Sequence, residues 1–327
     1  MSLLKRLLRP LSLPIARPRL SLVIVIYDMT AQAEKTILSL SNHYQRGVSE
    51  NDYEVIVVEN SSDNELGKTA AERFGGNIRY FRREEHRPTP VPAAHFGVGK
   101  AHGDMLGLMI DGARMASPGL VRQVLDAARL HANAVINIPG YHLGEKVQQE
   151  AMQSGYDEAE EDRLLESIDW PAQGYRLFDI ACWSRSSGQG FILPNAESNC
   201  LCMPMHVWEW LGGFDPAFTE TGGGQANPDL YKRACEHPDT QLVVIPGEGT
   251  FHQFHGGVTT GKPPEERDVH MQNHFEQYKS LRGSYYEAPQ TTAQLYGPLP
   301  ENAVRFMQRS LENAETRQQE TKGAQAS

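Results

Sequence analysis

The stretch SLVIVIYD, residues 21–28, is an uninterrupted apolar run that ends in a tyrosine and an acid. A strand of a parallel sheet has this appearance, because helices bury both of its faces. TAQAEKTILSLSNHY (30–44) follows with apolar residues at helical spacing, and YEVIVVEN (53–60) is a second buried run. Strand, helix and strand in this order predict one crossover unit of an α/β sheet.

The same alternation continues to about residue 140. We predict a helix over 64–75, strands over 77–82, 103–111 and 132–140, and a helix over 117–131 with Ser as its cap and Pro at its first position. Together these elements predict a doubly wound, mostly parallel twisted sheet flanked by helices. Ligands bind such sheets at the carboxyl ends of the strands, where Glu59, Asp63 and Asp111 stand.

The second half of the chain is less regular. Residues 157–169 hold seven acids and predict a solvated helix face or a mobile insertion. Cys200-x-Cys202 and His252-x-x-His255 contain zinc-type ligands, but neither has the spacing of a common zinc motif. Two thiols at the start of a predicted strand point to one face, so core packing is favoured over zinc.

The composition of the 327 residues is that of an ordinary globular protein, with 39% hydrophobic and 22% charged residues. A net charge of −10 and the lack of a long basic stripe argue against a nucleic-acid partner. Four cysteines are too few for a disulfide framework, so we expect a reducing, cytoplasmic location.

The first twenty residues differ from the rest, with five basic residues and no acid. They are interpreted either as a disordered leader or as a short segment that makes peripheral contact with an anionic membrane surface. A transit peptide is the less favoured third interpretation.

Several motifs follow one another in a fixed order. Tyr-Asp ends the first strand, VVENSSD ends the second, and AAHFGVGKAHGDMLGLMID (93–111) ends in a single acid. Gly-Gly-Phe-Asp stands at 212–215, Asp-Leu-x-x-Arg at 229–233, and a last strand ends near His252. Over residues 20–260 this set resembles the family 2 glycosyltransferases of the GT-A fold.

The resemblance implies a division of the chain and a reaction. A basic segment (1–20) precedes a GT-A domain (21–262), which has a nucleotide-binding half (21–140) and an acceptor half (141–262). A helical extension with a flexible tail (263–327) follows. The implied enzyme moves a sugar from a UDP- or GDP-sugar to a hydroxyl acceptor, which is a saccharide, a lipid-linked saccharide or a small metabolite, as in polysaccharide biosynthesis.

The resemblance also implies a nucleotide site. Its candidate residues are Tyr27, Glu59, Asp63, His95, Asp111 and Arg114. Glu59 is expected to accept hydrogen bonds from a base or ribose, with a turn carboxylate as the alternative. Tyr27 is expected to line the base, with ordinary packing as the alternative.

In the family, a divalent cation is held by Asp-x-Asp and often by a later histidine, and Mg²⁺ or Mn²⁺ suits such oxygen ligands. Here the motif is Asp111-Gly112-Ala113, so the second carboxylate is missing. Two alternatives stay open. Asp111 and His252 hold a cation with the help of phosphate oxygens, or Arg114 supplies a fixed positive charge to the diphosphate.

The family's general base is an acid in a Glu-Asp-x-Asp segment, but residues 226–229 read Ala-Asn-Pro-Asp. The amide of Asn227 cannot take a proton at neutral pH. Either Asp229 or Glu197 is the catalytic base, or the enzyme retains configuration and needs none. Asp215 is expected near the acceptor by the same resemblance.

Two rival functions fit the same residues. A nucleotide-sugar-binding protein without catalysis would tolerate both the incomplete Asp-x-Asp and Asn227. A sugar-phosphate nucleotidyltransferase is less favoured, because the glycine-rich basic loop expected after the first strand is missing. The sequence does not indicate the donor sugar, the acceptor or the oligomeric state.

Overall fold

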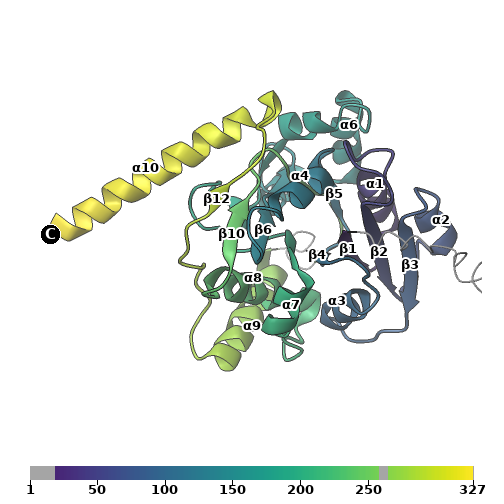
Figure 1. The fold of residues 1–327 in the computed structure, drawn as a ribbon, viewed down its shortest axis with the longest axis horizontal. Coiled ribbons are helices and arrows are strands. Elements are labelled where there is room, and N and C mark those ends of the chain that lie inside the picture. Colours follow the sequence, from purple (N-terminus) through teal and green to yellow (C-terminus); the bar gives the residue numbers. More distant parts are fainter. Residues whose placement is uncertain (1–18, 258–263, 327) are drawn as a thin grey trace, which may run out of the picture.

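The computed structural model describes residues 19–257 and 264–326, and its body is built on an eight-stranded sheet (Figure 1). In sheet order the strands are β12 (Gln294–Leu295), β10 (Gln241–Val244), β6 (Ala134–Ile138), β9 (Cys200–Pro204), β4 (Met105–Met109), β1 (Leu20–Ile26), β2 (Tyr53–Asn60) and β3 (Ile78–Arg83). Neighbouring strands are parallel except at β9, which is antiparallel to both β4 and β6. The predicted mostly parallel sheet is confirmed.

Helices cover both faces of this sheet. On one face, α1 (Thr30–Leu40), α2 (Lys68–Glu72) and α4 (Leu120–Ala127) share a core with Leu22 and Ile24 of β1. On the other face, the core contains Val23 and Val25 together with three other helices, which are α3 (Val91–Val98), α7 (Met205–Leu211) and α8 (Ala226–Glu236). Successive side chains of a strand point to opposite faces, so an uninterrupted apolar run fits β1.

A second, four-stranded sheet has the order β5 (Arg114–Ala116), β11 (Thr250–His252), β7 (Gly140–Leu143) and β8 (Ala181–Trp183). Tyr141 and Phe251 stack within its aromatic core, with ring centroids 5.3 Å apart. The register pairs His252 with Arg114 on β5 and with His142 on β7. Directly paired residues project to the same face of a sheet, so these three side chains form one polar row.

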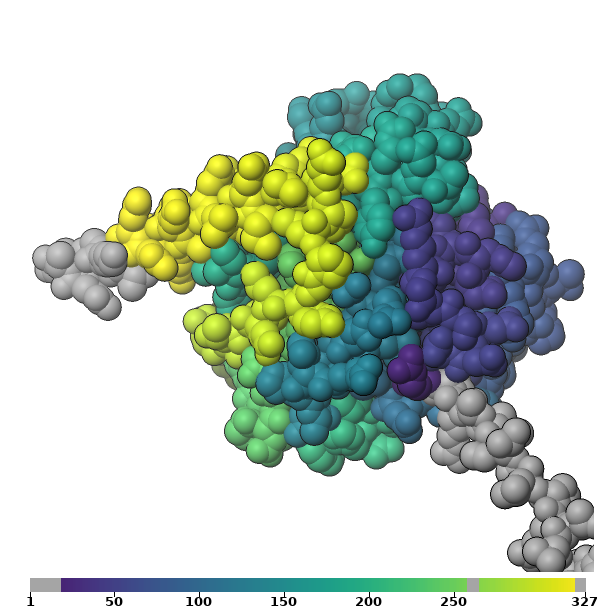
Figure 2. Space-filling model, turned by 45° about the horizontal axis from the view of Figure 1, so that its top comes forward, coloured from purple at the N-terminus to yellow at the C-terminus, as the bar shows by residue number. Residues whose placement is uncertain are grey.

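The C-terminal extension was predicted to be helical, and it also adds a strand. It consists of α9 (Pro264–Arg282), β12, which pairs in parallel with β10, and α10 (Val304–Ala326). Helix α10 projects away from the body (Figures 1 and 2). Arg305 anchors its first turn by donating hydrogen bonds to the backbone oxygens of Phe178 and Ala181.

The acidic segment is neither a fully solvated helix face nor a mobile insertion. Asp157 caps α6 (Glu158–Ser167) by accepting a hydrogen bond from the Glu160 amide. Glu161 and Leu165 lie on the buried face of this helix. On its outer side, Asp162 pairs with Lys35 of α1. The acids therefore include a buried member, which sequence alone did not indicate.

Other boundaries also differ from the prediction. The predicted strand over 132–140 divides into β6 and β7, and the predicted helix over 64–75 shrinks to α2. Helix α4 begins at Leu120 rather than after a Ser117 cap, because the Ser117 hydroxyl donates to Glu248 instead. Cys200 and Cys202 are buried with their sulfurs 4.0 Å apart, as core packing predicts.

The basic segment 1–20 lies outside the described residues, apart from its last two. Within residues 19–257 and 264–326, no helix combines the length and the apolarity that crossing a membrane requires.

Gly97 sets how closely α3 approaches the sheet. A methyl group there would lie 2.4 Å from Val23 Cγ1 and 3.0 Å from Val58 Cγ2. We expect Gly97→Ala to lower the free energy of unfolding by about 1–3 kcal/mol, the usual cost of overpacking a core. The urea unfolding midpoint measures this change.

Gly99, two residues further on, provides the matched control. Its φ is −63°, and a methyl group there would lie 3.4 Å from the Phe96 carbonyl oxygen and 3.5 Å from the His95 carbonyl oxygen, both ordinary contact distances. Gly99→Ala should leave the midpoint unchanged or raise it slightly, because alanine restricts the unfolded chain more than glycine does. Equal losses in both variants would contradict the close packing of α3.

Candidate functional site

Asp111 stands in the tight turn that joins β4 to β5. The Ala113 amide donates to Asp111 Oδ1 over 3.1 Å, which closes the turn. A Cβ atom at Gly112 would lie only 2.8 Å from the Val25 carbonyl oxygen, so the turn packs directly against β1. Ala113 is fully buried. The position at which the family has a second acid is therefore packed inside the protein here.

Two histidines converge on Asp111 from the loop at the end of β11. His252 Nε2 lies 3.0 Å from Asp111 Oδ2, and His255 Nε2 lies 3.7 Å from Asp111 Oδ1. The three ligand atoms lie within 4.8 Å of one another. In the described part of the chain, this is the one such group of at least three His, Cys, Asp or Glu residues.

The predicted pair Asp111 and His252 is thus brought together. His255 was not among the predicted metal ligands of the nucleotide site. In the sequence, only the spacing His252-x-x-His255 pointed to a role for His255. Because His255 lies in a loop, that spacing alone does not predict where its side chain lies.

The protonation states of this group suit a cation. Burial raises the pKa of the Asp111 carboxyl, but His252 and Arg114 lower it more, so it lies well below its usual range. For His252, burial and the Arg114 charge outweigh Asp111 and lower the pKa to about 4. At neutral pH Asp111 is therefore ionised and His252 is neutral. An ionised carboxylate and a neutral imidazole are the forms that bind metals.

Arg114 lies beside the same carboxylate, with its Nε 3.3 Å from Asp111 Oδ2. The residue is only 9% exposed, and its Nη1 has no hydrogen-bond partner. A buried donor without a partner costs free energy, more so when it is charged. An anionic oxygen bound next to Asp111 would satisfy it.

Two predicted nucleotide residues, Tyr27 and Asp63, are exposed. Ile24 of β1 pairs with Met109 of β4, so Tyr27 comes level with Gly112. The Tyr27 side chain is exposed, as an aromatic group that contacts a ligand should be. Asp63 is exposed in the turn after β2.

Glu59 is fully buried and its oxygens are occupied. It accepts hydrogen bonds from the amides of Leu66 and Gly67, over 2.8 and 3.0 Å, and from the Tyr80 hydroxyl over 2.6 Å. This is the turn role that the sequence left open as the alternative. A nucleotide contact by Glu59 stays a prediction.

His95 links α3 to the Gly-Gly-Phe-Asp segment. Its Nε2 lies 2.8 Å from the Phe214 carbonyl oxygen, and its ring packs 5.3 Å from that of Trp208. It also lines a cavity of about 470 Å³ with Arg87, Gly212 and Pro216. The structure thus shows a bridging role for His95, and a nucleotide contact stays a prediction.

Asp229 and Asp215 share a network of arginines. Asp229 is 1% exposed and is bound by Arg233 over 2.8 Å and by Arg282 over 2.7 and 3.0 Å. Asp215 accepts from the Ala217 amide and from Arg282, and both lower its carboxyl pKa. The lowered pKa makes the Asp215 carboxylate a poor proton acceptor.

Glu197 has a different environment. Its Oε2 accepts a hydrogen bond from Asn227 Nδ2 over 3.0 Å, and Asn227 also donates to the Ser198 carbonyl oxygen. Among the described residues, no cation forms an ion pair with Glu197. Leu108 of β4 pairs with Leu201 of β9, so the segment before β9 emerges at the same sheet edge as Asp111.

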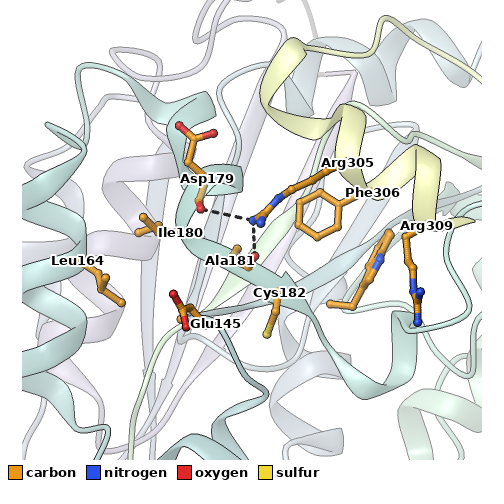
Figure 3. Close-up of a pocket in the computed structure, with 11 residues that line it drawn as sticks. Glu145, Leu164, Asp179, Ile180, Ala181, Cys182, Arg305, Phe306 and Arg309 are labelled. Carbon is orange, nitrogen blue, oxygen red and sulfur yellow. Dashed lines mark hydrogen bonds between the residues drawn. The ribbon is translucent and has the colours of Figure 1, made fainter.

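A cavity of about 490 Å³ lies apart from this cluster, at the open edge of β8. Glu145, Cys182 and Phe306 are among its lining residues, and Arg305 reaches the Asp179 and Ala181 carbonyl oxygens beside it (Figure 3). Neither Asp111 nor either histidine lines it.

A mostly parallel sheet, with an acid at the end of its central strand, defines the class: this is a GT-A fold. Crystal structures of S. aureus TarS share it. TarS is 9% identical, with a TM-score of 0.51 over 80% of this chain, which spans 40% of TarS. TarS 1–349 with UDP-GlcNAc is 10% identical, with a TM-score of 0.51 over 80% of this chain and 66% of that one.

Residues 21–182 match the family described as Glycosyl transferase family 2, which confirms the predicted resemblance to glycosyltransferase enzymes of that family. No curated protein matches the sequence. The matched residues include Asp111 and Arg114, whereas Glu197, Asp229 and His252 lie beyond them.

The arginine network predicts that Asp229 serves stability. Arg282→Ala removes two hydrogen bonds to a buried carboxylate, and hydrogen bonds to charged groups contribute about 1.5–3 kcal/mol each. Since Arg233 still pairs with Asp229, we expect a loss of about 2 kcal/mol in the free energy of unfolding, measured by urea denaturation. Arg309→Ala, which breaks an exposed pair with Glu312, should have almost no effect. Equal effects would contradict a structural role for the network.

Proposed function

We propose that this chain transfers a glycosyl group from a UDP- or GDP-sugar to a hydroxyl acceptor, with Mn²⁺ or Mg²⁺ held by Asp111, His252 and His255. The convergence of three metal-ligand atoms within 4.8 Å, at the strand end of a family 2 domain, carries this proposal. TarS 1–349 has been solved with UDP-GlcNAc, and we carry only the ligand class, a nucleotide sugar, to this chain.

The donor set fits a divalent cation despite the missing second carboxylate. One carboxylate and two imidazole nitrogens are ligands that Mn²⁺ accepts, and diphosphate oxygens complete the shell. When bound, the cation neutralises the charge that develops on the leaving diphosphate. Arg114 acts on the same charge, because its free Nη1 is available to a diphosphate oxygen. The cation and Arg114, which the sequence left open as alternatives, thus act together in this proposal.

We place Glu197 as the base that accepts the proton of the acceptor hydroxyl. Asn227 holds one of its oxygens, and no hydrogen bond from the described residues reaches the other. Asn227 therefore positions the base from the place at which the family has an acid. A base at this point implies inversion of configuration at the transferred sugar.

The remaining expectations belong to the same proposal. The acceptor is a saccharide, a lipid-linked saccharide or a small metabolite. The protein acts in the cytoplasm, and residues 1–20 provide any contact with a membrane surface.

Removal of the metal tests the proposal directly. EDTA should abolish the release of nucleoside diphosphate from the donor, and added Mn²⁺ should restore it. Asp111→Asn keeps the shape of the side chain but removes its charge, and should lower turnover by roughly 10²–10³-fold, as loss of a key electrostatic group does. Asp126→Asn, on the surface of α4, is the matched control and should keep full activity.

Two results would contradict the metal assignment. Activity that survives EDTA but is lost in Arg114→Ala would show that Arg114, without a metal, neutralises the charge of the leaving diphosphate. A protein that binds UDP- or GDP-sugars and never releases nucleoside diphosphate would be a binding protein instead.

The base assignment is tested by a pair of variants. Glu197→Gln can keep its hydrogen bond from Asn227 but cannot take a proton, so kcat should fall by about 10²–10⁴-fold. Its Mn²⁺ affinity and thermal stability should stay at the wild-type values. Asp229→Asn should lower the free energy of unfolding, because it removes the charge that Arg233 and Arg282 bind. If Glu197→Gln stays active while a fully stable Asp229→Asn is inactive, Asp229 is the base.

A further inference from the structure

Gln148 is the first residue of α5 (Gln148–Ala151) and is completely buried. Its side chain contacts His252, one of the proposed metal ligands. Its backbone amide donates to His142 Nδ1 over 2.9 Å, which fixes the start of the helix. A completely buried amide side chain needs partners for both its oxygen and its nitrogen, because unmet polar groups are costly in the interior.

The partners decide which way this amide points. Gln148 Nε2 lies 3.0 Å from the His252 carbonyl oxygen and 3.4 Å from Glu161 Oε2. The carbonyl oxygen can only accept hydrogen bonds, so the NH₂ group must face it. Gln148 Oε1 therefore faces His252 Nδ1, at a distance of 2.5 Å.

This orientation determines the tautomer of His252. An amide oxygen carries no hydrogen, so His252 Nδ1 must be the donor and carry the proton. A cation can then bind His252 only through Nε2, the other ring nitrogen. Nε2 lies 3.0 Å from Asp111 Oδ2 and 3.2 Å from His255 Nε2. Gln148 thus directs Nε2 to the place where the cation is proposed.

Glu161 of α6 holds Gln148 in turn. It is 1% exposed and accepts from Gln148 Nε2, from the Tyr156 hydroxyl over 3.1 Å and from the Phe254 amide over 2.7 Å. Its carboxylate therefore ties α5 and α6 to the loop that carries His252 and His255. The acidic helix α6 thereby becomes part of the support for the metal ligands.

We infer that Gln148, oriented by Glu161, is a positioning residue that fixes His252 as the Nδ1–H tautomer and presents Nε2 to the divalent cation. The inference rests on the proposed function for its cation, and on the hydrogen bonds alone for the tautomer. Partners that orient a ligating histidine typically change metal affinity by 10–100-fold when they are removed.

The test uses the full-length chain and two readouts other than activity. Long-range ¹H–¹⁵N correlation spectra of the metal-free protein report the tautomer of His252, assigned with a His252→Asn variant. Titration with Mn²⁺ alone, followed by electron paramagnetic resonance, gives the affinity. Wild type should show the Nδ1–H tautomer, and Gln148→Leu should bind Mn²⁺ about 10–100-fold more weakly.

Two further variants separate positioning from a loss of fold. Gln149→Leu makes the same change at the next residue and should leave Mn²⁺ affinity unchanged. The double variant Gln148→Glu with Glu161→Gln keeps the total charge and returns an acceptor to His252 Nδ1, but it leaves the His252 carbonyl oxygen without the donor that Gln148 provides. It should recover part of the affinity lost in Gln148→Leu.

The inference is overturned if wild-type His252 carries its proton on Nε2, or if Gln148→Leu binds Mn²⁺ as tightly as wild type does. A wild-type protein that binds no Mn²⁺ would remove the cation from the proposed function. In that case the tautomer in wild type and in Gln148→Leu still decides whether Gln148 orients His252.

Discussion

The approach of His252 to Asp111 is the contact on which this structure depends. Asp111 stands two residues after the central strand β4 of the main sheet, whereas His252 ends β11 of the second sheet. Four residues separate β4 from β5, and the first residue of β5, Arg114, pairs with His252. The turn between β4 and β5 therefore joins the two sheets and brings Asp111 and Arg114 next to the two imidazoles in a largely buried space. A cation and an anionic ligand together would balance this set of charges.

The acidic residues of the acceptor half show that environment, more than residue type, sets the role of a carboxylate. Asp229 is held between two arginines and Asp215 shares one of them, so both carboxylates are engaged in ion pairs. Glu197 is held by a neutral amide and keeps one oxygen without a partner among the described residues. Asn227 thus donates to Glu197, whose segment emerges at the same end of the strands as Asp111.

The sequence predicted the main sheet because apolar runs such as residues 21–26 are typical of strands buried on both faces, as in a parallel sheet. Asp111 and His252 were predicted through motifs that include an acid after a strand and a histidine after another. The antiparallel insertion of β9 could not be predicted, since strand order depends on contacts distant in sequence. Ser117 failed as a helix cap for the same reason, because its partner Glu248 lies 131 residues away. Gln148 and Glu161 look like ordinary surface residues in the sequence, and only the packing of α5 and α6 buries them.

Anomalous diffraction at the manganese edge, from crystals grown with Mn²⁺ and a nucleoside diphosphate, tests the central claim most directly. We predict one strong peak between Asp111 Oδ2 and His252 Nε2, with His255 and diphosphate oxygens in the same coordination shell and Arg114 against the diphosphate. A bound diphosphate without a peak there, contacted by Arg114 alone, would contradict the proposed metal site.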